Sequence, residues 1–176
     1  MIFNTNWFET GIYTCTIYCV YMPVDVVWFK RDLRARDHVP LLSASLSGRP
    51  VICLYILETE RLEQKDTDPI HIQWELDCAA DLSRTLNDSG AFLHYGLGDA
   101  TEVLEAIHLE HGIERLLSHE ETGNTWSYSR DISVSNFCKS RGIKWIEYPN
   151  NGVVRRLGNR DGWKRERDKR MRDPLS

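Results

Sequence analysis

The stretch VDVVWFKRDLRARDH, residues 24–38, joins a run of apolar residues directly to a loop of alternating charges. The apolar part, Val24–Phe29, is rich in β-branched and aromatic residues, which is typical of a strand buried on both faces of a sheet. A second run of this kind, VICLYIL, follows at Val51–Leu57. Three more candidate strands lie at residues 91–95, 113–118 and Lys144–Tyr148.

Helical patterns separate these five runs. Apolar residues step by three or four positions from Ile72 to Leu86, which gives one apolar helix face. Asp99 followed by Glu102 resembles a capping box at the start of another helix. Three glycines fall where the helices are expected to stop: Gly90, Gly112 and Gly142. The alternation predicts a doubly wound, Rossmann-like α/β domain: a five-stranded parallel sheet between two helical layers (α/β/α).

The overall composition is that of a globular protein, with 41% hydrophobic and 27% charged residues in a chain of 176. No apolar run reaches the roughly 20 residues that a membrane-spanning helix needs. The five cysteines form no CxxC pair, and the six histidines show no HxH or HExxH spacing. We therefore expect reduced thiols, a cytoplasmic location and no metal site.

The two ends of the chain differ from the part between them. Residues 1–22 contain no Lys or Arg and do not fit the domain pattern, so we expect an extension, with Met22 as the natural start. Residues 23–150 are expected to form the domain. Residues 151–176 are basic: nine Lys/Arg stand against four Asp/Glu between positions 153 and 173. We interpret them as a truncated linker with paired charges; a nucleic-acid-binding arm is the alternative.

Ligands of doubly wound sheets bind at the carboxyl ends of the strands. This rule directs attention to the loops at residues 30–38, 57–69 and 119–125. The first loop contains no glycine-rich phosphate fingerprint, which disfavours ordinary dinucleotide binding. Its charged residues either brace neighbouring loops or grip an anionic or carbonyl-rich ligand; they are Lys30, Arg31, Asp32 and Arg34.

The loop after the fourth predicted strand reads SHEETGNTWSYSRD, residues 118–131. Two interpretations stay open. As a pocket wall, its carboxylates and amide would fix a heterocycle on which its aromatic rings stack. As a helix N-terminus, the same acids would favour the helix dipole. The residues in question are Glu120, Glu121, Asn124, Trp126 and Tyr128. No catalytic residue can be assigned, so the residues alone indicate an α/β ligand-binding domain.

Four stretches resemble one known family, in the same order along the chain. VVWFKRDLRARDH (26–38) resembles the WFxxDLRxxD opening of the photolyase/cryptochrome family. PVICLYILE (50–58) is similar to the family's second strand, and LLSHEETGNTWSYSRD (116–131) to the fourth-strand segment of a bacterial branch. NGVVRRL…RDGW (151–163) resembles the linker of that branch.

The resemblance implies an amino-terminal α/β domain that binds an antenna chromophore: a folate, a deazaflavin or a flavin. In a deoxyribodipyrimidine photolyase, a following helical domain binds FAD and damaged DNA, and blue light drives the repair of pyrimidine dimers. The positions that match the family's pigment-lining loops are Lys30, Arg31, Asp32, Arg34, Glu58, Glu120, Glu121, Asn124 and Tyr128. The FAD-binding domain is missing here, so we expect the chain to be inactive alone.

Two other functions remain alternatives. The same domain occurs in cryptochromes, which are blue-light receptors, and the residues that separate the two classes would lie in the missing helical domain. A stand-alone α/β nucleotide-binding or interaction module would instead predict tight binding of a nucleotide such as ATP.

Overall fold

The computed structural model describes residues 22–150, 153–155 and 159–172 of the chain. All five of its strands are parallel, in the order β3-β2-β1-β4-β5. They are β1 (Val24–Phe29), β2 (Val51–Leu57), β3 (Leu93–Leu97), β4 (Ile113–His119) and β5 (Lys144–Tyr148). The predicted extension lies, except for Met22, outside the described residues.

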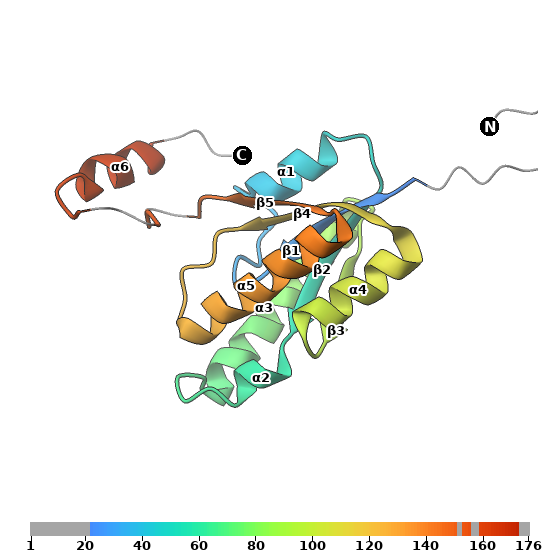
Figure 1. The fold of residues 1–176 in the computed structure, drawn as a ribbon, viewed down its shortest axis with the longest axis horizontal. Coiled ribbons are helices and arrows are strands. Elements are labelled where there is room, and N and C mark those ends of the chain that lie inside the picture. Colours follow the sequence, from blue (N-terminus) through green and yellow to red (C-terminus); the bar gives the residue numbers. More distant parts are fainter. Residues whose placement is uncertain (1–21, 151–152, 156–158, 173–176) are drawn as a thin grey trace, which may run out of the picture.

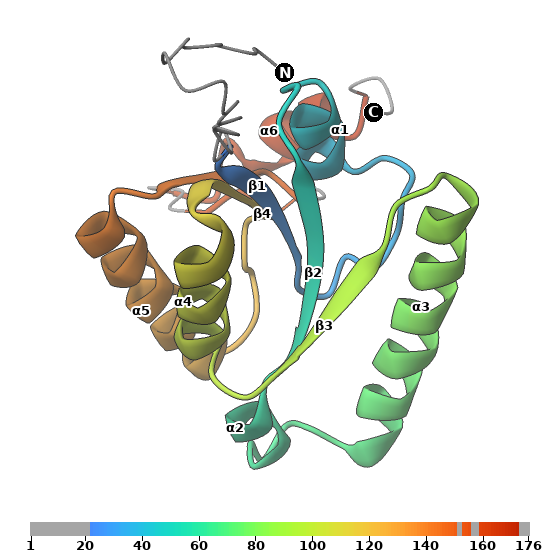
Figure 2. The ribbon, with the colours of Figure 1, turned by 90° about the vertical axis from the view of Figure 1, so that its right-hand side faces the viewer.

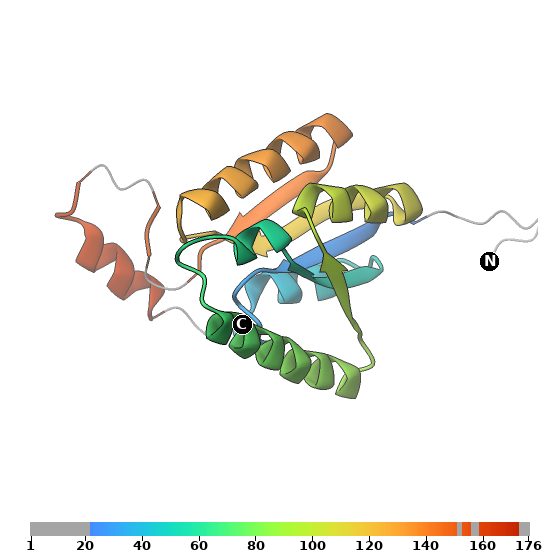
Figure 3. The ribbon, with the colours of Figure 1, turned by 90° about the horizontal axis from the view of Figure 1, so that it is seen from below.

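Helices connect the strands and cover the sheet. They are α1 (Val39–Ser45), α2 (Thr59–Leu62), α3 (Pro69–Asp88), α4 (Ala100–His111), α5 (Thr125–Arg141) and α6 (Trp163–Arg170). Figure 3 shows α4 and α5 on one face of the sheet and α1 and α3 on the other. This is the predicted three-layer, doubly wound arrangement. None of the helices in the described residues is long and apolar enough to cross a membrane.

The alternation of side chains along β1 explains the two helical layers. Val26 and Trp28 belong to the core beneath α4 and α5, whereas Val27 and Phe29 belong to the core beneath α1 and α3. Successive side chains of a strand point to opposite faces of a sheet, so a strand that is apolar at every position needs helices on both sides. Figure 2 shows β1 and β2 between these layers.

Two strand boundaries differ from the prediction. The third strand begins at Leu93 instead of residue 91, because the turn after α3 uses the intervening residues: Gly90 adopts a φ of 78° and the Ala91 N–H donates to the Leu86 carbonyl. The fourth strand extends one residue further, and His119 pairs with Tyr148 at the carboxyl end of the sheet. This extension brings His119 into the site described below.

The strand order places the crossover point of the sheet beside β1. From β1 the chain first winds outward through β2 and β3, then returns to the other side of β1 and adds β4 and β5. The loops that follow β1 and β4 therefore leave the same edge in opposite directions, at the position where such sheets bind ligands. Helix α6 lies apart from both helical layers, beyond this edge of the sheet (Figure 1).

Candidate functional site

Two clusters of charged side chains lie at the carboxyl ends of the strands. The first, which we call the Asp32 cluster, consists of Asp32, His38 and His119. The second, the Arg130 cluster, consists of Lys30, Glu58, Glu121, Arg130 and Asp131. Lys30 connects them, since its backbone N–H donates to Asp32 Oδ1 at 2.9 Å while its side chain belongs to the Arg130 cluster.

The Asp32 cluster is a buried carboxylate surrounded by hydrogen-bond donors. His38 Nε2 lies 2.8 Å from Asp32 Oδ2, and His119 Nδ1 hydrogen-bonds to the same oxygen. All three residues are buried. The contacts tie the loop after β1 to the start of α1 and to the end of β4.

The proton positions follow from the neighbours of His38. Its Nδ1 accepts a hydrogen bond from the Leu41 N–H at 3.1 Å, as the N-cap of α1. A neutral imidazole carries one proton, which must then sit on Nε2 and point to Asp32. Burial lowers the pKa of His38 despite the opposing effect of Asp32, which favours this neutral form. Burial alone would raise the pKa of Asp32, but hydrogen bonds from His119 and His38 outweigh it and hold that pKa well below its usual range.

The same three residues have the composition of a metal site, which the sequence did not suggest. One potential ligand atom of each lies within 4.8 Å of the others. The hydrogen bond from Leu41, however, places the proton of neutral His38 on Nε2, the atom that faces Asp32. A protonated nitrogen has no lone pair for a metal. The arrangement is therefore that of a hydrogen-bonded clamp rather than a preformed metal centre.

The Arg130 cluster is built around one guanidinium. Arg130 Nε lies 2.8 Å from Asp131 Oδ1, Nη2 lies 2.9 Å from Glu121 Oε2, and Nη1 pairs with Glu58. Lys30 Nζ lies 3.0 Å from Asp131 Oδ2. Arg130 is 9% exposed, so these charges are nearly removed from water and depend on one another.

Aromatic rings cover this cation. The Arg130 guanidinium lies 4.6 Å from the ring centroid of Trp28 and 5.6 Å from that of Trp126. Lys30 Nζ lies 4.8 Å from the ring centroid of Trp28. The indole N–H of Trp126 donates to Glu60 Oε2 at 3.3 Å, which fixes the ring beside α2. A flat, electron-rich surface thus stands next to a buried charge cluster.

The charge of the buried Glu58 carboxylate is only partly compensated. Burial raises its pKa to about 7, and the neighbouring Arg130 only partly opposes this. The physical reason is that Arg130 is shared among three carboxylates, so no one of them receives its full charge. Glu58 can therefore accept or donate a proton near neutral pH.

A cavity of about 140 Å³ opens beside this cluster. It lies where β2 ends and α4 begins, against the first turns of α5. Its walls are Glu58, Glu60, Gly98, Asp99, Thr101, Trp126, Ser129, Arg130 and Ser133. The wall contains three carboxylates and one arginine, so it is suited to a ligand that presents N–H or O–H donors. It is unsuited to a phosphate, because the Asp99 carboxylate already accepts the N–H groups of Thr101 and Glu102 at the start of α4.

The sequence-predicted residues divide between several environments. Lys30, Glu58 and Glu121 lie in the Arg130 cluster, and Asp32 lies in the Asp32 cluster. Arg31 is exposed and borders the corner formed by Lys30, Glu58 and Trp126.

The remaining four predicted residues make contacts of other kinds. Arg34 donates to the Asp37 carbonyl at 2.8 and 3.2 Å, which is the bracing role. Asn124 caps α5 and donates to Asp66 Oδ2 at 2.7 Å. Tyr128 is exposed on another side of α5, and Glu120 faces Arg170 at 4.0 Å.

Four members of these clusters were not among the predicted site residues: Arg130, Asp131, His38 and His119. For Arg130 a signal exists: once Asn124 is taken as a helix cap, the residues at helical spacing after it are Ser127, Arg130, Asp131, Val134 and Cys138, and all five are buried. An arginine on the apolar side of a helix needs buried partners. For the two histidines, only the fold brings them to Asp32.

The parallel sheet with helices on both faces defines the chain as a doubly wound α/β domain, and a cavity with charged and aromatic walls opens at the carboxyl ends of its strands. Residues 25–158 match the family model described as DNA photolyase. The chain belongs to the DNA photolyase family, and its fold is that of the family's amino-terminal domain.

Relatives from both branches of the family are similar to this chain. Cryptochrome DASH of Gloeobacter violaceus is 30% identical over 116 residues, which is 62% of this chain and 23% of the relative. The deoxyribodipyrimidine photo-lyase of Agrobacterium fabrum is 34% identical over 95 residues, 52% of this chain and 19% of the relative. The chain thus spans about a quarter or less of the length of these relatives.

Solved structures agree on the fold. The bacterial class III photolyase from Agrobacterium tumefaciens superposes with a TM-score of 0.67 at 26% identity, covering 83% of this chain and 30% of the other. A Synechocystis cryptochrome reaches a TM-score of 0.74 at 19% identity, covering 88% of this chain and 35% of the other. Members of the family bind flavin and antenna chromophores and act on DNA as full-length proteins.

Proposed function

We propose that residues 23–150 form the antenna-pigment-binding domain of a deoxyribodipyrimidine photolyase. The chromophore, a folate, a deazaflavin or a flavin, would bind at the carboxyl edge of the sheet with one end in the cavity beside Arg130. Residues 151–176 would begin the linker to an FAD-binding helical domain, and only the complete protein would recognise the lesion in damaged DNA and repair it.

The observation that carries this proposal is the cavity wall of Trp126, Arg130 and Glu58. A volume of about 140 Å³ is too small for a whole tricyclic ring system but suits one edge of a heterocycle. The indole of Trp126 supplies a stacking surface, and the Glu58 carboxylate can accept hydrogen bonds from ring N–H groups. Lys30 and Glu121 do not line the cavity, but they hold its wall in place through their ion pairs with Asp131 and Arg130.

Relatives support the choice of chromophores without deciding between them. A photolyase from Sulfolobus tokodaii, 22% identical to this chain, was solved with two FAD molecules, with a novel light-harvesting cofactor implicated. The acidic wall of the cavity favours a pigment that enters with its ring rather than with a phosphate. We therefore expect a deazaflavin, a folate or the isoalloxazine end of a flavin to bind more tightly than a free nucleotide.

The repair function is proposed on the photolyase family model and the photo-lyase relatives. The cryptochrome alternative shares this domain and has relatives of its own, but it is not better supported than the photolyase function. The cytoplasmic location also stays a prediction; it is supported by the unpaired thiols of Cys53, Cys78 and Cys138.

The test is a spectroscopic titration of the 176-residue chain with a methenyl-folate, an 8-hydroxy-deazaflavin and FMN in turn. Binding of one pigment should shift its near-ultraviolet or blue absorption and quench tryptophan fluorescence. Trp126→Ala should weaken that binding about fivefold or more, because a stacked aromatic ring contributes about 1–3 kcal/mol. The matched control is Trp74→Ala, which removes an indole that is 71% exposed on α3.

Equal loss of binding in both tryptophan variants would assign the effect to something other than the cavity. Failure of all three pigments to bind the wild-type chain would contradict an antenna site formed by these residues. Tight binding of ATP in place of the pigments would favour the stand-alone nucleotide-binding module.

A further inference from the structure

Helix α6 concentrates positive charge in a chain that is otherwise acidic. Residues 159–172 contain seven Lys/Arg and three Asp/Glu, whereas the other residues contain fifteen Lys/Arg and twenty-three Asp/Glu. Arg170, at the end of α6, contacts two other parts of the chain. Arg170 Nη1 donates to the Val153 carbonyl at 2.5 Å and lies 4.0 Å from Glu120 Oε2, at the end of β4.

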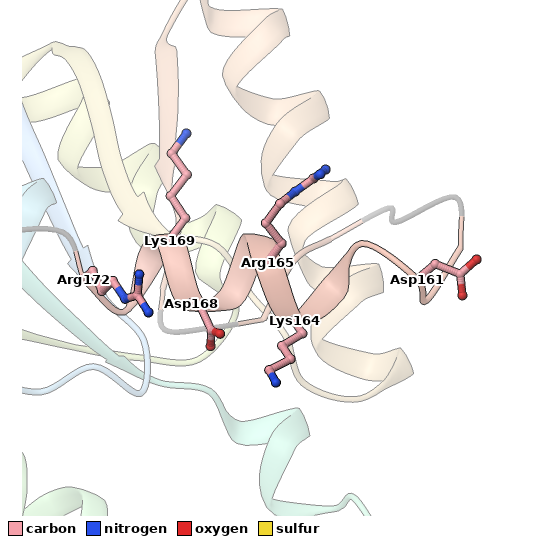
Figure 4. Close-up of a pocket in the computed structure, with 6 residues that line it drawn as sticks. All are labelled: Asp161, Lys164, Arg165, Asp168, Lys169 and Arg172. Atoms are coloured by element: carbon pink, nitrogen blue, oxygen red, sulfur yellow. The ribbon is translucent and has the colours of Figure 1, made fainter.

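Four exposed cations form what we call the α6 patch: Lys164, Arg165, Lys169 and Arg172. Together with Asp161 and Asp168 they border a shallow hollow of about 720 Å³. Figure 4 shows Arg165 and Lys169 extending to the same side of the helix, with Lys164 on the other side. These residues recur at helical spacing and border one hollow, so the long side chains flank the same face of the segment.

The charges of the α6 patch are not used by the fold. In the part of the chain that the structure describes, Lys164, Lys169 and Arg172 take part in no ion pair. Arg165 lies 3.6 Å from Glu166, but its side chain is 85% exposed. Asp168, one of the two acids that border the hollow, is paired with Arg167 at 3.0 Å. Such a surplus of solvated cations on one short helix is the electrostatic footprint of a polyanion-binding surface.

The helix suits a phosphate backbone better than a membrane. An interfacial membrane helix needs a continuous apolar face, but the apolar residues of this segment are Trp163 and Met171, at its two ends. The span from Lys164 in α6 to Arg172 in the turn that follows the helix is about 12 Å, at a rise of about 1.5 Å per residue. That length matches about three to four successive phosphates of one DNA strand, which follow each other every 3.4 Å along the duplex axis.

From these observations we propose that the α6 patch binds the phosphate backbone of double-stranded DNA. The contact is independent of base sequence and does not require a pigment, so it goes beyond the antenna function. In a complete photolyase it would hold DNA to the α/β domain at a place separate from the pigment cavity.

The test is binding of the 176-residue chain to a fluorescein-labelled 20-base-pair duplex, measured by anisotropy from 20 to 200 mM salt. Four phosphate contacts predict a slope of about −3 to −4 in a plot of log K against log salt concentration. The variant K164Q/R165Q/K169Q/R172Q should lose at least tenfold in affinity at 50 mM salt and flatten the slope to near zero. The matched control K65Q/R84Q/K139Q/K144Q removes the same charge from exposed positions of the body and should bind nearly as well as wild type.

Three outcomes would overturn the proposal: no DNA binding at 20 mM salt, equal losses in the two quadruple variants, or tighter binding to phosphatidylserine vesicles than to DNA. Circular dichroism of each variant shows whether the fold is kept. A second variant, K164Q/K169Q, should flatten the slope by about 2 and so reports on the patch even where the quadruple variant is unstable.

Discussion

The Asp32 cluster and the Arg130 cluster lie side by side at the same edge of the sheet, but they differ in charge balance. In the first, one carboxylate receives hydrogen bonds from two imidazoles and a backbone N–H. In the second, one guanidinium is shared by three carboxylates and borders a cavity. In the Asp32 cluster, the hydrogen bonds to the carboxylate come from within the fold, and they hold the loop after β1 against α1 and β4. The second leaves Glu58 incompletely compensated, and this is the condition in which a ligand can still contribute hydrogen bonds.

The largest difference between the clusters should appear when the Asp32 carboxylate is removed. Asp32→Ala leaves two buried imidazoles and a buried N–H without their acceptor, so we expect a loss of about 3–5 kcal/mol in the free energy of unfolding at pH 7. Because the pKa of Asp32 is held low, this stabilisation is present above pH 4 and disappears only in acid. Urea denaturation monitored by circular dichroism measures it.

The control for Asp32 is Asp81→Ala, which removes an exposed carboxylate paired with Arg84 at 3.0 Å. Exposed pairs contribute little, so this variant should unfold at nearly the wild-type urea concentration. If Asp32→Ala were equally mild, the Asp32 cluster would not be a clamp and the contrast with the Arg130 cluster would disappear.

The Arg130 cluster should instead make the free energy of unfolding depend on pH. The pKa of Glu58 is about 7 in the folded chain, against an ordinary value of 4.5. The folded state therefore holds this proton more tightly than the unfolded state, and the contribution of Glu58 to stability grows as the pH falls from 7 towards 4.5. Between pH 7 and pH 5 the gain is about 2 kcal/mol.

The measurement is the free energy of unfolding of wild type and Glu58→Gln at pH 5, 6 and 7. As the pH falls from 7 to 5, the free energy of unfolding of wild type should rise by about 2 kcal/mol relative to that of Glu58→Gln. Over the same range Asp32 stays ionised. The lowered pKa of His38 makes stability fall as the pH falls, but this effect is common to wild type and Glu58→Gln and cancels in their difference. A constant difference would show that Arg130 compensates Glu58 fully and that the two clusters are alike.

The sheet and its layers could be predicted from the sequence because they depend on local patterns. Runs such as Val24–Phe29 are apolar at every position, and only helices on both faces can bury them. The two clusters depend on contacts between distant residues. Asp32 meets His119 across 87 positions of the chain, and Lys30 meets Asp131 across 101. No spacing in the sequence encodes these pairs, so candidate residues could be named by loop but not by partner.

Asn124 illustrates the limit most clearly, since both interpretations of its loop were open. In the structure its Oδ1 accepts the Ser127 N–H at 3.0 Å and its Nδ2 donates to Asp66 Oδ2 at 2.7 Å. Both polar ends of the side chain are thus engaged by the fold, as expected of a helix cap. A role in contacting the pigment remains a separate prediction.

The smallest predicted effect, that of replacing Asn124, distinguishes a helix cap from a residue that contacts the pigment. Asn124→Ala should cost about 1 kcal/mol, the usual contribution of an N-cap, whereas Asn124→Ser keeps an oxygen for the Ser127 N–H and should cost less. Because α5 carries Arg130 and Asp131, loosening its first turn should disturb the Arg130 cluster before the Asp32 cluster. Urea denaturation of both variants, followed by pigment titration, provides the comparison. If the serine variant keeps its stability but loses the pigment, Asn124 contacts the chromophore directly; if it keeps both, its role is to begin the helix that positions Arg130.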